Sequence, residues 1–263
     1  MQFALRAVKW KSRWTLSKAG VSTSMASIYL VRHAQASFGT DDYDRLSSTG
    51  IRQARLAGRH LLARTRSLRQ VVTGSLKRHK DTATEVLASS DAARLSTERK
   101  IDDRFDELDT DAQIRTLCPE SARIISDAVQ PVHGWRPDGR AYQQTLKQAL
   151  LRWQAMPNPP HSLESWSQFQ SRVISGFEDL KGGSGPGETT IVVSSAGVIA
   201  CIVLHILGLP ADRFYCLFEV MNNGSITHIL HDRRRASVAS FNDCSYLYLD
   251  EAFRHDENLL TYR

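Results

Sequence analysis

From residue 28 onwards the sequence alternates short apolar runs with longer segments of helical periodicity, and this alternation constrains the fold most strongly. Short apolar runs rich in β-branched residues and bounded by turns are typical of strands that are buried on both faces. Strands that alternate with helices form a largely parallel sheet, which the helices cover on both sides. We therefore predict an α/β fold, a three-layer sandwich with a mostly parallel central sheet.

The pattern also predicts where the elements lie. The expected strands are residues 28–31, 70–73, 94–101, 190–194, 225–230 and 236–241. The expected helices are residues 48–65, 76–92, 114–129, 141–156, 163–180 and 197–207. Gly208 and Pro210 are expected to end the last of these helices. We expect one domain over residues 28–263, with a helical lid insertion at about 108–160.

Residues 1–27 form a basic extension that contains five basic residues and no acidic one. Its composition and helical spacing of aromatic residues resemble a mitochondrial transit peptide. A second interpretation is a tail, or a misassigned start, because Met25 directly precedes the first expected strand. We favour the second interpretation and expect a cytoplasmic protein; a true transit peptide would make it mitochondrial.

Charge and hydropathy argue against two classes of partner. The net charge is +6, but five of these charges belong to residues 1–27, so the expected domain is nearly neutral. Nucleic-acid-binding domains usually concentrate basic residues on the folded part, so we expect no nucleic-acid partner. The longest apolar run, residues 196–204, is far shorter than the roughly 20 residues of a membrane-spanning helix, so we expect no membrane partner. The oligomeric state leaves no signal in the sequence.

The cysteine and histidine spacings do not predict a metal or redox centre. None of the four cysteines forms a C-x-x-C pair. His228 and His231 lie three residues apart in an expected strand, where such side chains face opposite sides of the sheet. We therefore expect no metal and no cofactor.

Charged and polar residues follow the expected strands directly. Arg32 and His33 follow the first strand, Arg78 follows the second, Glu107 follows the third, and Ser195 follows the strand at 190–194. Ligands of open parallel sheets bind beyond the carboxyl ends of the strands, so these side chains are expected to converge. Two arginines, a histidine and a glutamate supply cationic clamps, a nucleophile and a proton donor, as phosphoryl transfer requires.

Four segments, in order and spacing, resemble the histidine phosphatase (phosphoglycerate mutase-like) superfamily. Residues 30–35 (LVRHAQ) resemble its R-H-G motif, and residues 46–54 resemble its L-T-x-x-G-x-x-Q-A segment. Residues 74–83 resemble its S-P-L-x-R-A-x-x-T-A segment, and residues 192–199 resemble V-V-S-H-G-G-V-I. The resemblance extends from residue 28 to about residue 209.

The resemblance implies a metal-independent phosphatase that acts on a small phosphorylated substrate. His33 would be the phosphorylated nucleophile, and Arg32 and Arg78 would bind the phosphoryl oxygens, as forked guanidinium groups do well. Glu107 would be the general acid and base, with Asp106 as its nearest rival. Three further residues could contact the substrate: Gln35, Ser37 and His79.

The sequence departs from the family pattern at several positions. Ala34 replaces the glycine after the nucleophile, and Gly74-Ser75 replaces Ser-Pro. The most serious departure is Ser195, which aligns with the family's second active-site histidine, a donor to the phosphoryl group. Ser195 would still be a phosphate-binding residue, helped by backbone N–H groups at the start of the following helix. His79 could replace the missing imidazole, although its side chain should point about 100° away from that of Arg78.

These departures leave two alternatives to a phosphatase. The first is a phosphoglycerate-type mutase of the same fold, which is disfavoured because residues 106–110 lack the E-R-x-Y-G-like segment of such mutases. The second is an inactive phosphate-binding or partner-binding protein, suggested by Ser195. The presence of Arg32, His33, Arg78 and Glu107 favours an active enzyme.

Overall fold

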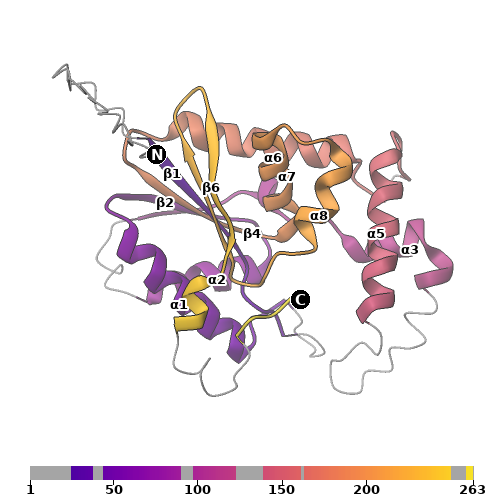
Figure 1. The fold of residues 1–263 in the computed structure, drawn as a ribbon, viewed down its shortest axis with the longest axis horizontal. Coiled ribbons are helices and arrows are strands. Elements are labelled where there is room, and N and C mark those ends of the chain that lie inside the picture. The colour runs from indigo at the N-terminus through magenta and orange to yellow at the C-terminus, as the bar shows by residue number, and fades with distance from the viewer. Residues whose placement is uncertain are drawn as a thin grey trace, which may run out of the picture.

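The computed structural model describes residues 25–37, 44–89, 97–122, 139–160, 163–249 and 259–262. These residues form one six-stranded sheet with the order β3-β2-β4-β1-β5-β6 (Figure 1). The strands are β1 (Ala26–Arg32), β2 (Leu68–Thr73), β3 (Glu98–Ile101), β4 (Thr189–Ser194), β5 (Ile226–His231) and β6 (Ala236–Asp243). Almost all of the basic extension lies outside the described residues.

The predicted α/β class and the mostly parallel sheet are confirmed. Strand β4 runs parallel to both β1 and β2, and β2 runs parallel to β3. The last two strands are antiparallel, β5 to β1 and β6 to β5. A connection of only four residues joins β5 to β6, which is long enough for a hairpin but far too short for a parallel crossover.

Helices cover both faces of the sheet. Helices α1 (Ser48–Arg64) and α2 (Lys77–Ala88) lie on one face, and α6 (Trp166–Gly183), α7 (Ala196–Leu207) and α8 (Phe214–Phe218) lie on the other (Figure 1). Strand β1 shows the reason, since alternate side chains of a strand point to opposite faces. Ile28 and Leu30 belong to the core under α6 and α7. Tyr29 and Val31 belong to the core under α1 and α2.

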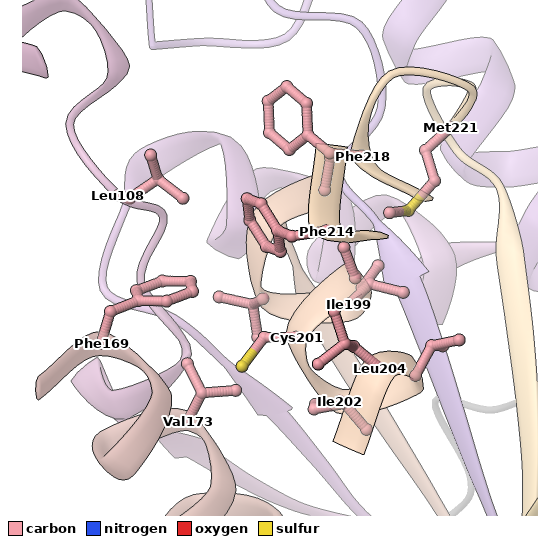
Figure 2. Close-up of a cluster of buried hydrophobic side chains, with 14 of the residues drawn as sticks. Leu108, Phe169, Val173, Ile199, Cys201, Ile202, Leu204, Phe214, Phe218 and Met221 are labelled. Atoms are coloured by element: carbon pink, nitrogen blue, oxygen red, sulfur yellow. The ribbon is translucent and has the colours of Figure 1, made fainter. Parts of the chain in front are cut away.

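Helix α7 is the best-buried helix of the described chain. Figure 2 shows its Ile199, Ile202 and Leu204 among side chains of α6 and α8, including Phe169 and Phe214. Its last turn ends at Gly208, which has a φ of 62°, as predicted from the sequence. Close packing on all sides holds the first turn of α7 in place at the carboxyl end of β4.

Several element boundaries differ from those predicted because capping side chains set them. The helix expected at 163–180 begins at Trp166, where Ser165 and Gln168 form a capping box. The helix expected at 114–129 begins earlier, as α3 (Thr110–Leu117), because the Asp109 side chain accepts from the N–H of Ala112. The expected single helix is also interrupted: α3 ends at Leu117 and Cys118 is not helical, since the residue before a proline (Pro119) disfavours the helical conformation, whereas residues 119–122 are helical again. Residues 123–129 lie outside the described residues. The other helix of the expected lid is α5 (Gly139–Ala155).

The described residues also contain short 3-10 turns: η2 (Asp103–Phe105), η3 (Ala211–Arg213) and η4 (Ser245–Leu249). The alternating pattern did not predict them, since three- to five-residue turns leave no periodicity. Among the described residues, every helix is too short or too polar to cross a bilayer.

Candidate active site

The side chain of His33 lies where the carboxyl ends of β1 and β4 meet. The His33 backbone N–H donates to the carbonyl of Ser194 over 2.8 Å, which extends the β1–β4 pairing by one residue. The His33 carbonyl accepts from the N–H of Gly224 at 3.2 Å and from Nδ2 of Asn223 at 3.3 Å. The backbone of His33 is therefore held by two separate parts of the chain, the end of β4 and the neighbouring residues Asn223 and Gly224.

The His33 ring presents one nitrogen with a free lone pair. Its Nδ1 lies 2.9 Å from the carbonyl oxygen of Ala34. A carbonyl oxygen can only accept, so Nδ1 carries the hydrogen and the neutral ring has its lone pair on Nε2. Burial lowers the pKa of His33 well below its ordinary value, and the positive charges of Arg78 and Arg32 lower it further. The ring is therefore a neutral imidazole, which is the nucleophilic form.

The two predicted arginines come from different elements, and the charges of both act on His33. Arg32 is the last residue of β1 and is 6 % exposed, and its Nη1 donates to the carbonyl of Met221 over 2.5 Å. Arg78 lies in the first turn of α2, and its Nη1 is 2.5 Å from Oδ1 of Asp44. The same Asp44 carboxylate accepts from the N–H of Lys77 at 2.7 Å. Asp44 thus fixes both Arg78 and the start of its helix.

Glu107 lies in the loop after η2 and caps α7 from outside the helix. Its Oε2 accepts from the N–H of Gly197 at 3.1 Å, and its Oε1 accepts from the N–H of Leu108 at 3.1 Å. The sequence predicted that backbone N–H groups around Ala196 and Gly197, at the start of the helix, would favour an anion. At Gly197 the anion that the N–H binds is the Glu107 carboxylate of the same chain, and a phosphate contact at this helix start stays a prediction.

The structure brings Ser195 and His79 together. Ser195 precedes α7, and its Oγ lies 2.7 Å from Nε2 of His79. Both residues are fully buried, and the ring centroids of His33 and His79 are 5.8 Å apart. The angle of about 100° between neighbouring helical side chains does not keep His79 away, because α2 packs against β4 and directs His79 toward the end of that strand.

Asp106, the predicted rival of Glu107, is already bound to the preceding loop. Its two carboxylate oxygens accept from the N–H and the hydroxyl of Ser75, each over 2.5 Å. Its Oδ1 lies 3.9 Å from Nδ1 of His79. Burial lowers the pKa of His79 well below its ordinary value, and the charges of Arg78 and Lys80 act in the same direction. His79 is therefore also neutral.

Gln35 and Ser37 lie in the loop after His33 and are engaged with the protein itself. The side-chain carbonyl of Gln35 accepts from the hydroxyl of Ser47 at 2.7 Å, and its backbone N–H donates to Oε1 of Gln53 at 2.9 Å. The N–H of Ser37 donates to the carbonyl of Arg45 at 2.8 Å. These bonds fix the loop, and a role in substrate contact for either residue stays a prediction.

A cavity of about 220 Å³ opens beside Glu107. It is lined by Glu107, Leu108, Asp109, Gln113, Trp153, Leu163 and Glu164. Gln113 comes from α3 and Trp153 from α5, so the two helices of the expected lid form its walls. His33, in contrast, does not line this cavity.

Sequence reasoning missed two residues that hold the site, Asp44 and Asn223. Each acts on a residue far away in the chain, Asp44 on Arg78 and Asn223 on His33. Neither lies in a motif, so no local pattern could have indicated them. Among the residues that the structure describes, no cluster of three or more His, Cys, Asp or Glu side chains could hold a metal ion.

The fold and the site define an α/β protein with a neutral histidine and two arginines at the carboxyl edge of a mostly parallel sheet. The sequence model of the histidine phosphatase superfamily (branch 1) matches residues 28–141 and 134–244. The chain belongs to this superfamily, as its motifs predicted.

Solved structures of similar fold include phosphatases and a mutase. Bacillus stearothermophilus YhfR is 18 % identical, with a TM-score of 0.60 over 84 % of this chain and 99 % of that one. The mycobacterial glucosyl-3-phosphoglycerate phosphatase is 22 % identical, with a TM-score of 0.55 over 82 % and 98 %. A phosphoglycerate mutase from Bacillus anthracis is 18 % identical, with a TM-score of 0.53 over 86 % and 96 %. No curated protein sequence matches the chain.

Proposed function

We propose that the protein is a metal-independent phosphatase that hydrolyses small phosphomonoesters through a phosphohistidine at His33. One observation carries the proposal: the lone pair of the neutral His33 ring lies on Nε2, and two arginine charges act on that ring. Arginine forks bind phosphoryl oxygens bidentately and stay charged at all physiological pH values. The superfamily and its phosphatase neighbours support the same reaction class.

In the first step, Nε2 of His33 attacks phosphorus while the bond to the ester oxygen breaks. Arg32 and Arg78 balance the charge on the phosphoryl oxygens. Protonated Glu107 gives its proton to the departing alkoxide, which leaves as the alcohol. Nε2 is then bonded to phosphorus, and the ring keeps its hydrogen on Nδ1 through the Ala34 carbonyl.

In the second step, the Glu107 carboxylate takes a proton from water as the water oxygen attacks phosphorus. The phosphorus–nitrogen bond breaks, inorganic phosphate leaves, and the neutral His33 ring is restored. Glu107 can serve both steps because each carboxylate oxygen has two lone pairs and uses one in its bond to Gly197 or Leu108. Acid–base help of this kind is worth about 10²–10⁴ in rate.

We further propose that residues 108–160 act as the lid that selects the alcohol part of the substrate. The support is the cavity beside Glu107, whose walls include Gln113 and Trp153. A leaving group that receives its proton from Glu107 would extend into this cavity. Its volume of about 220 Å³ is suited to a small leaving group.

The test is a screen of phosphomonoesters in the presence of a chelator, together with acid-labile labelling of the protein. We expect turnover that survives chelation, a label that is lost in acid, and the loss of both in His33→Ala. Activity that disappears with the chelator, or that persists in His33→Ala, would contradict the proposal.

The same experiment separates the two alternatives. A mutase would transfer the label to a second position of a sugar or glycerate phosphate faster than to water. A binding protein would take up phosphate without ever carrying an acid-labile label. The second alternative is motivated by Ser195, which stands where the family pattern has histidine.

We also propose a cytoplasmic location. All four cysteines are free thiols, and a reducing compartment maintains free thiols. Fractionation of cells that express the full chain tests this, and mitochondrial recovery with loss of the basic extension would favour the transit-peptide interpretation.

A further inference from the structure

The pair formed by His79 and Ser195 is buried in the candidate site and has no role in the two steps described above. Their side chains are joined over 2.7 Å, and neither is exposed to solvent. We propose that the pair supplies one hydrogen bond to the phosphoryl group on His33: the Ser195 hydroxyl donates it, and His79 positions that hydroxyl. This inference rests on the proposed function.

The position of Ser195 supports contact with the phosphoryl group. The residue before it, Ser194, accepts from the backbone N–H of His33 at 2.8 Å, so Ser195 follows the point where β4 touches the nucleophile. A serine at the start of a helix normally uses its hydroxyl to cap the first turn. Within the described residues the Ser195 hydroxyl makes no such bond, and Glu107 caps Gly197 instead. The hydroxyl is therefore available for another acceptor.

The chemistry of the bond gives its direction. Phosphoryl oxygens only accept, so the Ser195 hydroxyl must turn its hydrogen toward them, and Oγ must then accept from Nε2 of His79. A neutral imidazole has one N–H, which leaves Nδ1 of His79 with a lone pair. This tautomer fits the structure, because Nδ1 has no hydrogen-bond partner among the described residues and the nearest carboxylate oxygen, of Asp106, is 3.9 Å away. A buried lone pair without a partner is tolerated better than a buried N–H without one.

The departures from the family pattern lie together in space. A Cβ on residue 74 would come within 2.4 Å of Nδ1 of His79, so the His79 ring fits there only because residue 74 is glycine. Ser75, in place of proline, has an N–H and a hydroxyl, and both bind the Asp106 carboxylate that faces His79. The departures from the family pattern therefore belong together, at Gly74, Ser75, His79 and Ser195. In this chain the second imidazole of the site comes from α2, at His79, and not from the residue that precedes α7.

The first test measures the rate of His33 phosphorylation by 4-nitrophenyl phosphate and the inhibition by vanadate. We expect Ser195→Ala and His79→Leu each to lower the phosphorylation rate by about 10²–10³, the worth of one preorganised donor. The double variant should lose no more than either single one, because the two residues act as a unit. His79→Gln should keep most of the rate, since its amide N–H can replace Nε2–H as donor to Ser195.

The second test exchanges the two positions. Ser195→His alone should be slow, because the new ring would collide with His79, whose Nε2 is only 2.7 Å from the present Oγ. Ser195→His combined with His79→Ala should recover activity toward the wild-type rate. His205→Leu, at a half-exposed histidine of α7, is the matched control and should change neither rate nor vanadate inhibition.

The outcomes separate this inference from the proposed function. If wild type becomes phosphorylated and both Ser195→Ala and His79→Leu do so at the same rate, this inference is overturned while the proposed function stands. His79→Gln and His79→Leu could both unfold at the wild-type temperature and yet phosphorylate His33 equally slowly. In that case His79 would not position the Ser195 hydroxyl by donating a hydrogen bond to it. If wild type never carries a label, both proposals fail together.

Discussion

The backbone N–H of Gly197 donates to Oε2 of Glu107 over 3.1 Å, and this bond joins the first turn of α7 to the loop that follows β3. The contact requires a glycine. A Cβ at position 197 would lie 2.3 Å from Oε1 of Glu107, closer than any packed atoms lie. The position of Glu107, the proposed general acid, therefore depends on the absence of a side chain at residue 197 of α7.

Gly197→Ala should displace Glu107 and slow the hydrolysis of esters with poor leaving groups. An alkyl phosphate needs a proton on its leaving oxygen, whereas a nitrophenyl phosphate does not. We expect kcat on an alkyl phosphate to fall by up to about 10²–10⁴ and kcat on 4-nitrophenyl phosphate to fall much less. Gly182→Ala is the control, because nothing lies within 4 Å of a Cβ at that position. If Gly197→Ala hydrolysed the alkyl ester at the wild-type rate, Glu107 would not be the general acid.

Arg78→Ala should weaken vanadate binding strongly. The variant removes a charge that acts on His33 and also leaves Asp44 without its 2.5 Å ion-pair partner. Truncating one partner of a desolvated charge pair costs about 2–5 kcal/mol, which corresponds to roughly 30- to 5,000-fold in the inhibition constant. Arg55→Ala, at an exposed ion pair between α1 and α2, is the control and should bind vanadate normally. Equal inhibition of the two variants would exclude Arg78 from the site.

The stability of the protein should fall as the pH drops below about 6.5. The pKa values of His33 and His79 are lowered in the folded state, so below that pH the unfolded chain binds protons that the folded chain does not. Each such histidine contributes a slope of up to about 1.4 kcal/mol per pH unit. Urea unfolding between pH 7 and pH 5 measures the slope, and His79→Gln should reduce it. If His79→Gln kept the wild-type dependence of the unfolding free energy on pH, His79 would be protonated in the folded state over this pH range.

Gln53→Leu should destabilise the fold and loosen the loop after His33. The fully buried amide accepts from the N–H of Gln35 at 2.9 Å and donates to the carbonyl of Leu259 at 2.8 Å and to Oγ1 of Thr261 at 3.0 Å. Leaving these buried groups without partners should lower the free energy of unfolding by about 2–4 kcal/mol. The exposed Gln148→Leu in α5 should change it by less than about 0.5 kcal/mol. Equal urea midpoints for the two variants would contradict this.

Much of the fold could be predicted because it depends on local patterns. Buried strands such as β1 and β4 are short and apolar, helix starts carry capping side chains, and Gly208 ends α7, so each element leaves its own trace in the sequence. The same holds for His33 and Arg78, which follow strands within recognisable motifs. Boundaries set by Asp109 and Ser165 were missed by a few residues because several nearby residues could have served as caps.

By itself, the sequence determined the α/β class, the superfamily and the set of side chains at the strand ends, because periodicity and motif spacing are properties of neighbouring residues. Only the tertiary structure decided how those side chains are paired. His79 and Ser195 are 116 positions apart, and Glu107 and Gly197 are 90 apart. Such pairs form where the sheet brings β2, β3 and β4 to a common edge, and no local pattern records which residues then lie within hydrogen-bond distance.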